Sequence, residues 1–362
     1  MPRVAIVYLT YYDEPHYLDA ASLSVAEQSY PRNDLAFVVV DNSCHGPSAK
    51  YVREHILSRS GRDLPETILI ENDENVGFAE GNNQGIRWAM ERGFDYVFLL
   101  NNDAKLDSRA IEEAVKTAES DEKIGAVQSF LLLWQKPELV NSSGNDLHFL
   151  GFGITRDYGR PRKEITRQDG EEIAFASGAA VLYRVNTLRH VGLLESFYWM
   201  YHEDVELGWR LKLAGYKSVF AARSIVYHDY SFSRSTQKMF WMERNRLLTH
   251  LALLRPRSIL VLAPSALFME LAVLTGALRG GWFGKKLASY GALLRPSTLR
   301  WLRRKREEIN DLRRIGDGEA TSVFVPRIDH QEVNNPLLRF FLNPILHLYW
   351  KLAKCLLQDP LL

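Results

Sequence analysis

The chain has 362 residues, which is enough for one large domain and a smaller one. Hydrophobic residues make up 46% and charged residues 25%, a globular composition that excludes a largely disordered chain, and the formal net charge of +1 gives no general attraction to nucleic acid. The two cysteines, Cys44 and Cys355, lie far apart, which excludes a disulfide framework and a cysteine-ligated zinc site and fits a reducing cytosol.

Short apolar runs alternate with helical patterns over the first two-thirds of the chain, and this alternation predicts an α/β sheet with helices on its faces. The N-terminal apolar run is too short for a signal peptide, so we expect a first buried strand there. Strands are expected at 4–9, 36–40, 67–71, 96–100, 125–131 and 218–227. Helices are expected at 17–28, 49–58, 82–92, 108–120 and 204–214, with left-handed caps at Gly93 and Gly215.

From about Ser235 the composition shifts to Leu, Arg, Trp and Phe, so we expect an α/β domain over 1–235 and a helical region over 236–362. Within the latter, 258–278 is apolar and just long enough to span a membrane. Glu270 and Pro264 interrupt this run, which favours a helix lying in the membrane interface over a span; a buried core helix is the third interpretation.

Two basic segments of the helical region, 300–306 and 337–354, contain aromatic residues as well as Lys and Arg. This composition suits an anionic cytoplasmic membrane leaflet, and a solvated basic face is the alternative.

Two motifs are candidates for binding a nucleotide. Asp41 follows a buried strand, at the end where ligands bind in open α/β sheets, and its carboxylate can accept the imide N–H of uracil or thymine. An Asx turn is the alternative. The segment 75–85, with glycines at 77, 81 and 85, predicts a tight loop into a helix N-terminus whose N–H groups can face phosphates or ribose. A turn that simply requires small residues would give the same pattern.

A candidate metal motif closes the next strand, where Asn101, Asn102 and Asp103 follow five apolar residues. Mg²⁺ commonly uses one or two protein carboxylates and completes its octahedron with phosphate oxygens and water. We therefore expect Asp103 to bind a divalent cation and Asn101 to lie nearer the ribose or sugar; a helix or turn cap is the alternative.

A third group of motifs is a candidate for catalysis. The small residues at 177–180, including Gly178, can line a sugar pocket or serve packing. His202, Glu203 and Asp204 open a helix behind an aromatic segment; Asp204 is the expected base for an acceptor hydroxyl, Glu203 a supporting residue, and a helix cap the alternative. His228 follows another strand and is a candidate metal ligand only in combination with these motifs, since a lone histidine is more often structural.

Taken together, the motifs VVVDNS, ENVGFAEGNNQGI, FLLNNDAKLD, ASGAAVLYR and WMYHEDVELGWRLKLAGY followed by VYH resemble glycosyltransferase family 2, in its bacterial rhamnosyltransferase-like branch. The resemblance covers about residues 4–230. It implies a GT-A fold with a mixed, mainly parallel sheet, and an inverting, Mg²⁺- or Mn²⁺-dependent transfer. It also implies a base at Asp204, metal contacts at Asp103 and His228, and nucleotide-side contacts at Thr10, Tyr12, Asp41 and Asn82. The motifs add six further candidate substrate contacts: Gly77, Asn101, Asn102, Gly178, His202 and Glu203.

This sequence departs from the family pattern at Asn101, where an Asp is more usual, and over 44–48, where a different loop follows VVVDNS. The Asn at 101 leaves fewer negative charges to bind a cation. Because the loop at 44–48 differs, the contacts that this loop makes in the family are not carried over to this chain.

We therefore hypothesise a transferase that moves L-rhamnose from dTDP-rhamnose to a lipid-linked saccharide at the cytoplasmic face of a membrane, in cell-surface polysaccharide assembly. UDP-galactofuranose or a UDP-hexose is the alternative donor. A nucleotide-sugar-binding scaffold is the rival from another class, although a scaffold needs no base. A dehydrogenase is a poorer rival, because no GxGxxG follows the first strand.

Overall fold

The computed structural model describes residues 1–12, 15–230, 236–328 and 338–357. It contains two compact units. Unit 1 comprises Met1–Asn145, Thr155–Gly208 and Tyr216–Ser231, and unit 2 comprises Asp146–Ile154, Trp209–Gly215 and Phe232–Leu362. Two short segments from the α/β part of the sequence thus belong to the helical unit. The expected boundary between two domains at residue 235 stays a prediction.

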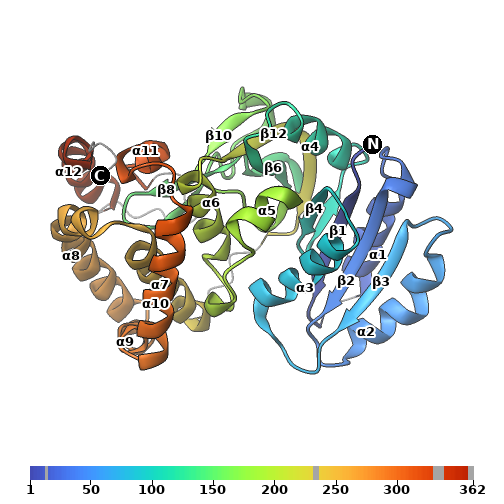
Figure 1. The fold of residues 1–362 in the computed structure, drawn as a ribbon, viewed down its shortest axis with the longest axis horizontal. Coiled ribbons are helices and arrows are strands. Elements are labelled where there is room, and N and C mark those ends of the chain that lie inside the picture. Colours follow the sequence, from blue (N-terminus) through green and yellow to red (C-terminus); the bar gives the residue numbers. More distant parts are fainter. Residues whose placement is uncertain (13–14, 231–235, 329–337, 358–362) are drawn as a thin grey trace. The chain divides into compact units, whose positions relative to one another are not determined.

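The core of unit 1 is a mixed sheet with strand order β10-β12-β6-β11-β4-β1-β2-β3, extended by β5 on β12 and β7 on β6 (Figure 1). Strands β1, β2, β3 and β4 are parallel, while β11 runs antiparallel between β4 and β6. The long strands are β1 (Val4–Thr10), β2 (Leu35–Asp41), β3 (Glu66–Glu71), β4 (Tyr96–Leu100), β6 (Ile124–Leu133) and β12 (Lys217–His228).

All six strands expected from the sequence are present, each at or within about two residues of its expected bounds, and the fold class is confirmed. Seven further strands lie outside these six: β5 (Ala104–Leu106), β7 (Lys136–Ser142), β8 (Asn145–His148), β9 (Gly153–Thr155), β10 (Glu171–Ile173), β11 (Ala180–Arg184) and β13 (Phe324–Val325). Of these, only β11, which is apolar and buried and follows the small residues at 177–180, was indicated by the sequence; most of the others are very short or polar. Strands β13, β8 and β9 form a separate three-stranded sheet.

Unit 1 contains the helices α1 (Pro15–Ala26), α2 (Pro47–Tyr51), α3 (Gly77–Glu91), α4 (Ala110–Ala118), α5 (Val185–Val191) and α6 (Glu203–Leu213), the last of which continues into unit 2. Five of them were expected; α5 was not, and α3 begins at Gly77, five residues before its expected start. The helix expected over 49–58 is regular only as far as Tyr51, and wider and tighter turns follow it. Gly93 and Gly215 have φ of +70° and +86°, as expected for left-handed caps.

Helix α3 packs closely on β1 because two of its glycines have no side chain. A Cβ at Gly81 would lie 2.5 Å from a methyl of Leu9, and a Cβ at Gly85 would lie 2.5 Å from a methyl of Val7. Two of the three glycines that predicted a phosphate loop therefore serve helix–sheet packing.

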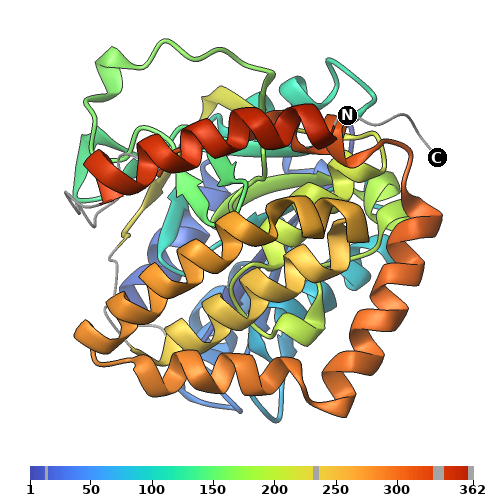
Figure 2. The same cartoon turned by 90° about the vertical axis from the view of Figure 1, so that its left-hand side faces the viewer.

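Unit 2 is mainly helical, with α7 (Thr236–Leu253), α8 (Pro256–Arg279), α9 (Phe283–Leu293), α10 (Pro296–Leu312), α11 (Asp317–Ala320) and α12 (Asn343–Leu357). Figure 2 shows α12 crossing above α8. The centre of this unit holds ion pairs between Glu243 and Arg246 at 2.8 Å and between Lys286 and Glu270 at 2.7 Å. Burial alone would raise the pKa of Glu243, but Arg246 and Lys286 hold it at about 2, so the group is ionised.

Candidate active site

The nucleotide-side residues predicted from the sequence lie at the ends of β1 and β2. Thr10 and Asp41 are register partners, and both are fully buried. Among the described residues, Oγ1 of Thr10 has no hydrogen-bond partner. Ser43 donates to both carboxylate oxygens of Asp41, at 2.7 and 2.9 Å. Burial raises the pKa of Asp41, and the Ser43 hydrogen bond partly opposes this rise.

A buried amide network connects these strand ends to α3. Asn42 donates to the carbonyl of Gly77 at 3.0 Å, and Asn72 donates to Oδ1 of Asn42 at 2.8 Å. Asn72 also exchanges hydrogen bonds with Gln84. Sequence reasoning missed Asn72, although an amide directly after a buried strand was an available signal.

The other nucleotide-side candidates are placed differently. Asn82 is buried on α3 and donates to the Phe78 carbonyl of its own helix at 2.9 Å. Tyr12 lies on the loop after β1, is 54% exposed and has a left-handed backbone with φ of +53°. The structure thus groups Thr10, Asp41 and Gly77, ties Asn82 to its helix, and leaves Tyr12 open to solvent.

The two candidate metal ligands meet, although 125 residues separate them. Nε2 of His228 lies 2.9 Å from Oδ1 of Asp103. Asn101 donates to the same Asp103 oxygen at 2.6 Å, and the Asp103 carbonyl accepts from the Asp229 N–H at 2.8 Å. Strand β5 pairs with the end of β12, and this pairing brings Asp103 beside His228.

A residue that the sequence analysis missed, Asn141, orients the His228 ring. Its Oδ1 accepts a hydrogen bond from Nδ1 of His228 at 2.9 Å, and both side chains are buried. An amide oxygen carries no proton, so the hydrogen must be on Nδ1. In the neutral ring, Nε2 then points a lone pair at the Asp103 carboxylate. The Asn101 amide nitrogen lies 2.6 Å from this carboxylate oxygen and 3.4 Å from Nε2. A carboxylate and an imidazole nitrogen that face each other are also groups that a divalent cation accepts as ligands.

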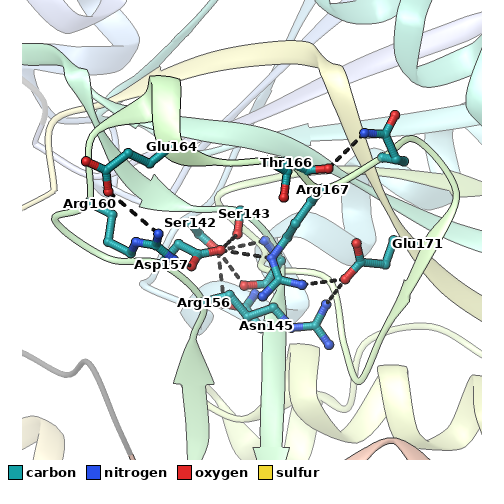
Figure 3. A network of polar contacts seen from close by, with 12 residues as sticks. Ser142, Ser143, Asn145, Arg156, Asp157, Arg160, Glu164, Thr166, Arg167 and Glu171 are labelled. Carbon is teal, nitrogen blue, oxygen red and sulfur yellow. Dashed lines mark hydrogen bonds and ion pairs between the residues drawn. The ribbon is translucent and has the colours of Figure 1, made fainter.

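The strand that carries Asn141 contacts a loop with a partly buried polar network (Figure 3). Asp157 accepts from Ser143 at 2.5 Å, from Arg167 at 2.8 Å and from Arg160 at 2.9 Å. The loop's backbone also pairs with β7, since the Val140 N–H donates to the Arg160 carbonyl at 2.9 Å. Asn141 is therefore held between β6 on one side and this loop on the other.

The candidate base lies at the start of α6, after a strained turn. Trp199, Tyr201 and His202 all have a left-handed backbone, with φ between +64° and +72°. Such conformations cost about 1–3 kcal/mol each in residues other than glycine and cluster at functional sites. Asp204 accepts from its neighbour's N–H, that of Val205, at 2.8 Å and from the Gly178 N–H at 3.4 Å.

Glu203, beside the candidate base, is only 5% exposed, and its Oε2 has no hydrogen-bond partner among the described residues. Burial, together with the Asp204 carboxylate, raises the pKa of Glu203 well above its ordinary value. Burial also raises the pKa of Asp204. Raised carboxyl pKa values make stronger bases, so the environment suits proton abstraction.

The base side and the metal-ligand side are joined through the segment before β11. Gly178 donates to Asp204, and the carbonyl of the next residue, Ala179, accepts from the Asn101 N–H at 2.9 Å. Because β11 is antiparallel to β4, its first residues lie at the edge where β4 ends. Asn102 contributes its carbonyl to the Tyr8 hydroxyl, and His202 contributes its carbonyl to the Glu206 N–H.

The residues present fit a divalent cation whose coordination is completed by the phosphates of a bound substrate. Among the described residues, no group of three or more His, Cys, Asp or Glu is arranged to hold a metal ion. Asp103 and His228 offer one carboxylate and one imidazole nitrogen, and a cation site that also binds substrate phosphates commonly has only one or two protein carboxylates.

Solved structures with the same fold define the class of protein. GalNAc-T7, solved with UDP, GalNAc and Mn²⁺, superposes with a TM-score of 0.58 at 12% identity, over 74% of this chain and 51% of that chain. The mannosyltransferase PcManGT of Pyrobaculum calidifontis, solved with GDP-Man and Mn²⁺, gives 0.52 at 20% identity over 86% of both chains. Both are glycosyltransferases, and the fold of this chain is therefore the GT-A fold.

The family model described as glycosyltransferase like family 2 matches residues 2–248, so the chain belongs to glycosyltransferase family 2. Poly-beta-1,6-N-acetyl-D-glucosamine synthase of Staphylococcus aureus is 24% identical over 58% of this chain and 46% of its own length. The low-salt glycan biosynthesis hexosyltransferase Agl10 of Haloferax volcanii is 27% identical over 49% of this chain and 53% of its own. The matches span about half of each relative.

Replacing Glu203 by Gln should change the pH dependence of stability. The folded state keeps the Glu203 proton to higher pH than the unfolded chain, so the stability from this group is full below its ordinary pKa of 4.5 and is lost as pH rises toward the raised pKa. Relative to the variant, the wild type should lose up to about 1.4 kcal/mol of unfolding free energy per pH unit in this window. Urea denaturation at stepwise pH measures the difference.

The matched control for this experiment is Glu91→Gln, an exposed position at the end of α3. Its unfolding free energy should run parallel to that of the wild type. A parallel curve for Glu203→Gln as well would contradict the argument from burial.

Replacing Asn141 by Ala should weaken Mn²⁺ binding in the presence of UDP by about 10- to 100-fold, because His228 loses the acceptor that fixes its tautomer. Electron paramagnetic resonance measures free Mn²⁺, and NMR of the imidazole nitrogens reports the tautomer in the metal-free protein. Glu138→Gln, an exposed change on the same strand, is the control. An unchanged affinity with an unchanged tautomer would show that Asn141 does not orient the ring.

Proposed function

We propose that this family 2 glycosyltransferase moves L-rhamnose from dTDP-rhamnose to a hydroxyl of a lipid-linked saccharide, with inversion at the anomeric carbon. The observation that carries the proposal is the joining of the Asp103–His228 pair to the Asp204 carboxylate through Gly178, Ala179 and Asn101. A single-displacement transfer needs a base on the acceptor side and charge stabilisation on the leaving-group side.

Asp204 is the proposed base. Its carboxylate takes the proton of the acceptor hydroxyl, and the oxygen then attacks the anomeric carbon as the bond to the diphosphate breaks. The Val205 and Gly178 N–H groups hold the carboxylate in place. The buried, unpartnered Glu203 oxygen supplies a hydrogen-bonding group for a sugar hydroxyl.

Asp103 and His228 are the proposed ligands of Mg²⁺ or Mn²⁺. Two observations support these ligands. Nε2 of His228 faces the Asp103 carboxylate at 2.9 Å, and two solved structures of the same fold contain Mn²⁺. When bound, the cation supplies charge stabilisation to the departing diphosphate. The chain's own part is to present one carboxylate and one imidazole nitrogen in a fixed orientation, which Asn101 and Asn141 maintain.

The donor proposal has two parts, the nucleobase of the nucleotide and the sugar. For the nucleobase, Asp41 at the strand end favours a pyrimidine with an imide N–H, and Thr10 provides an unpartnered hydroxyl beside Asp41. For the sugar, rhamnose comes from the motif resemblance, with Tyr12, Gly77, Asn82, Asn102 and His202 as further proposed contacts. UDP-galactofuranose or a UDP-hexose is the second candidate, because a relative is named a hexosyltransferase.

A lipid-linked acceptor and a site of action at the cytoplasmic face of a membrane complete the proposal, within the assembly of a surface polysaccharide. They are supported by helix α8, which is long and apolar enough to cross a membrane. Only 17% of its most apolar 18-residue stretch is buried, so this helix is mostly exposed.

Replacing Asp204 by Asn should lower kcat by about 100- to 10,000-fold, because the amide cannot accept the hydroxyl proton. UDP binding with Mn²⁺ should stay near the wild-type value, since Asp204 is not among the proposed metal ligands. Steady-state kinetics and calorimetry provide the two readouts. Asp63→Asn, at an exposed carboxylate paired with Arg59, is the control and should retain activity. Turnover retained by Asp204→Asn would remove Asp204 as the base.

Calorimetry against dTDP-rhamnose, UDP-galactofuranose, UDP-glucose and UDP-GlcNAc tests the donor. With Mn²⁺, dTDP-rhamnose should bind at least about tenfold more tightly than the others, a difference of about 1.4 kcal/mol. With EDTA, the preference and the affinity should both fall. Tightest binding of a UDP-sugar would replace rhamnose by that sugar, and tight binding in EDTA would argue against the metal.

A further inference from the structure

Helix α8 exposes its apolar residues instead of burying them. Leu260, Leu267, Leu271 and Leu278 are between 64% and 73% exposed and recur every four or seven residues, so they form one stripe. The opposite side of the helix carries the buried residues Ser258, Leu262, Ser265, Met269 and Ala277. A helix of a water-soluble protein normally shows the reverse at its surface.

The polar side of α8 is fixed inward by ion pairs. Glu270 pairs with Arg246 of α7 and with Lys286 of α9, and it accepts from the Tyr290 hydroxyl. Glu243 pairs with the same Arg246 and Lys286, so two acids and two bases balance. If α8 left this packing to cross a bilayer, Glu270 would face lipid and its partners would lose their counter-charge. These pairs keep α8 docked on α7 and α9 with its leucine stripe outward.

Helix α12 also exposes an apolar stripe and lies against α8, although its buried side is mostly apolar as well. Ile345, Leu348, Leu352 and Leu356 are exposed at helical spacing. Trp350, on the other side, is buried and stacks on Phe149 with ring centroids 4.7 Å apart. The Tyr349 hydroxyl donates to a backbone carbonyl of α8, that of Val261, so the two helices touch. Two neighbouring helices, whose ribbons are seen in Figure 2, thus both expose apolar side chains.

The charge around these stripes has one sign. Helices α8 and α12 carry four Lys or Arg, namely Arg257, Arg279, Lys351 and Lys354, and one acidic residue, Glu270, which is paired internally. Arg257, Arg279 and Lys351 are exposed. A surface that combines leucines with an excess of cations is complementary to an anionic lipid bilayer. A second copy of the chain would instead place like charges against each other.

We propose that unit 2 docks in the plane of an anionic lipid bilayer through a docking face made of the outward stripes of α8 and α12, namely Leu260, Leu267, Leu271, Ile345, Leu348 and Leu352. The inference rests on the proposed function in one respect, because a lipid-linked acceptor would be presented at such a surface. It makes α8 an interfacial helix and not a transmembrane one.

Flotation of the full chain with vesicles tests the docking face. Binding should be strong to phosphatidylcholine vesicles that contain phosphatidylglycerol, weaker to phosphatidylcholine alone, and reduced by high salt. The double variant Leu267→Gln with Leu348→Gln should lose at least about tenfold in vesicle affinity, since both side chains are exposed and leave apolar contact with lipid. Leu23→Gln, at an exposed leucine of α1, is the matched control and should bind like the wild type.

A second measurement separates lying in the plane from spanning. Single cysteines at Leu260→Cys and Leu278→Cys, in a chain with Cys44→Ser and Cys355→Ser, carry a nitrobenzoxadiazole label. Both labels should shift to shorter emission wavelength on vesicle binding, and external dithionite should bleach both. Protection of one label would mean that α8 spans, which overturns the in-plane placement.

The remaining outcomes also decide the proposal. Equal vesicle binding by the double variant and the wild type would overturn the docking face. Absence of vesicle binding would overturn it too, and a dimer that the double variant dissociates would then identify a second copy as the occupant. Donor calorimetry on the same preparations shows whether the nucleotide-sugar site is intact, so failure to dock is distinguishable from failure of the proposed function.

Discussion

A parallel sheet buried on both faces leaves polar groups only at the ends of its strands, and the site of this transferase depends on that constraint. Strands β1, β2 and β4 are buried along almost their whole length. The first polar groups after them, including Thr10, Asp41 and Asn101, therefore gather at one edge. Strand β11 runs the opposite way beside β4 and brings Gly178 to the same edge.

The segment before the proposed base depends on the loop before α3. The carbonyl of Trp199 accepts from the Ala79 N–H at 3.2 Å, and a Cβ on Gly77 would lie 2.4 Å from the Trp199 ring. A glycine is thus required where the nucleotide-side loop meets the strained turn that leads to Asp204. This close packing joins the start of α3 directly to the turn before the proposed base.

The two units place their charged and apolar side chains in opposite ways. Unit 1 places apolar side chains inside and collects carboxylates, amides and one imidazole at a strand edge. Unit 2 places compensated charges at its centre and leucines on its outside. Compensated charges stabilise a unique helix arrangement only while all partners remain, so the inward position of Glu270 also determines which face of α8 is outward.

The sequence by itself determined the long strands, most helices, the glycine caps and the identity of Asp103, Asp204 and His228 as candidates, because these depend on local periodicity and on residues adjacent in the chain. It did not reveal Asn141, which meets His228 across 87 residues, or the internal partners of Glu270. Nor did it show that Gly81 and Gly85 serve packing, or that Asn82 bonds its own helix. Only the tertiary structure decided these points, because strand register and helix packing, which no local pattern encodes, determine which distant side chains meet.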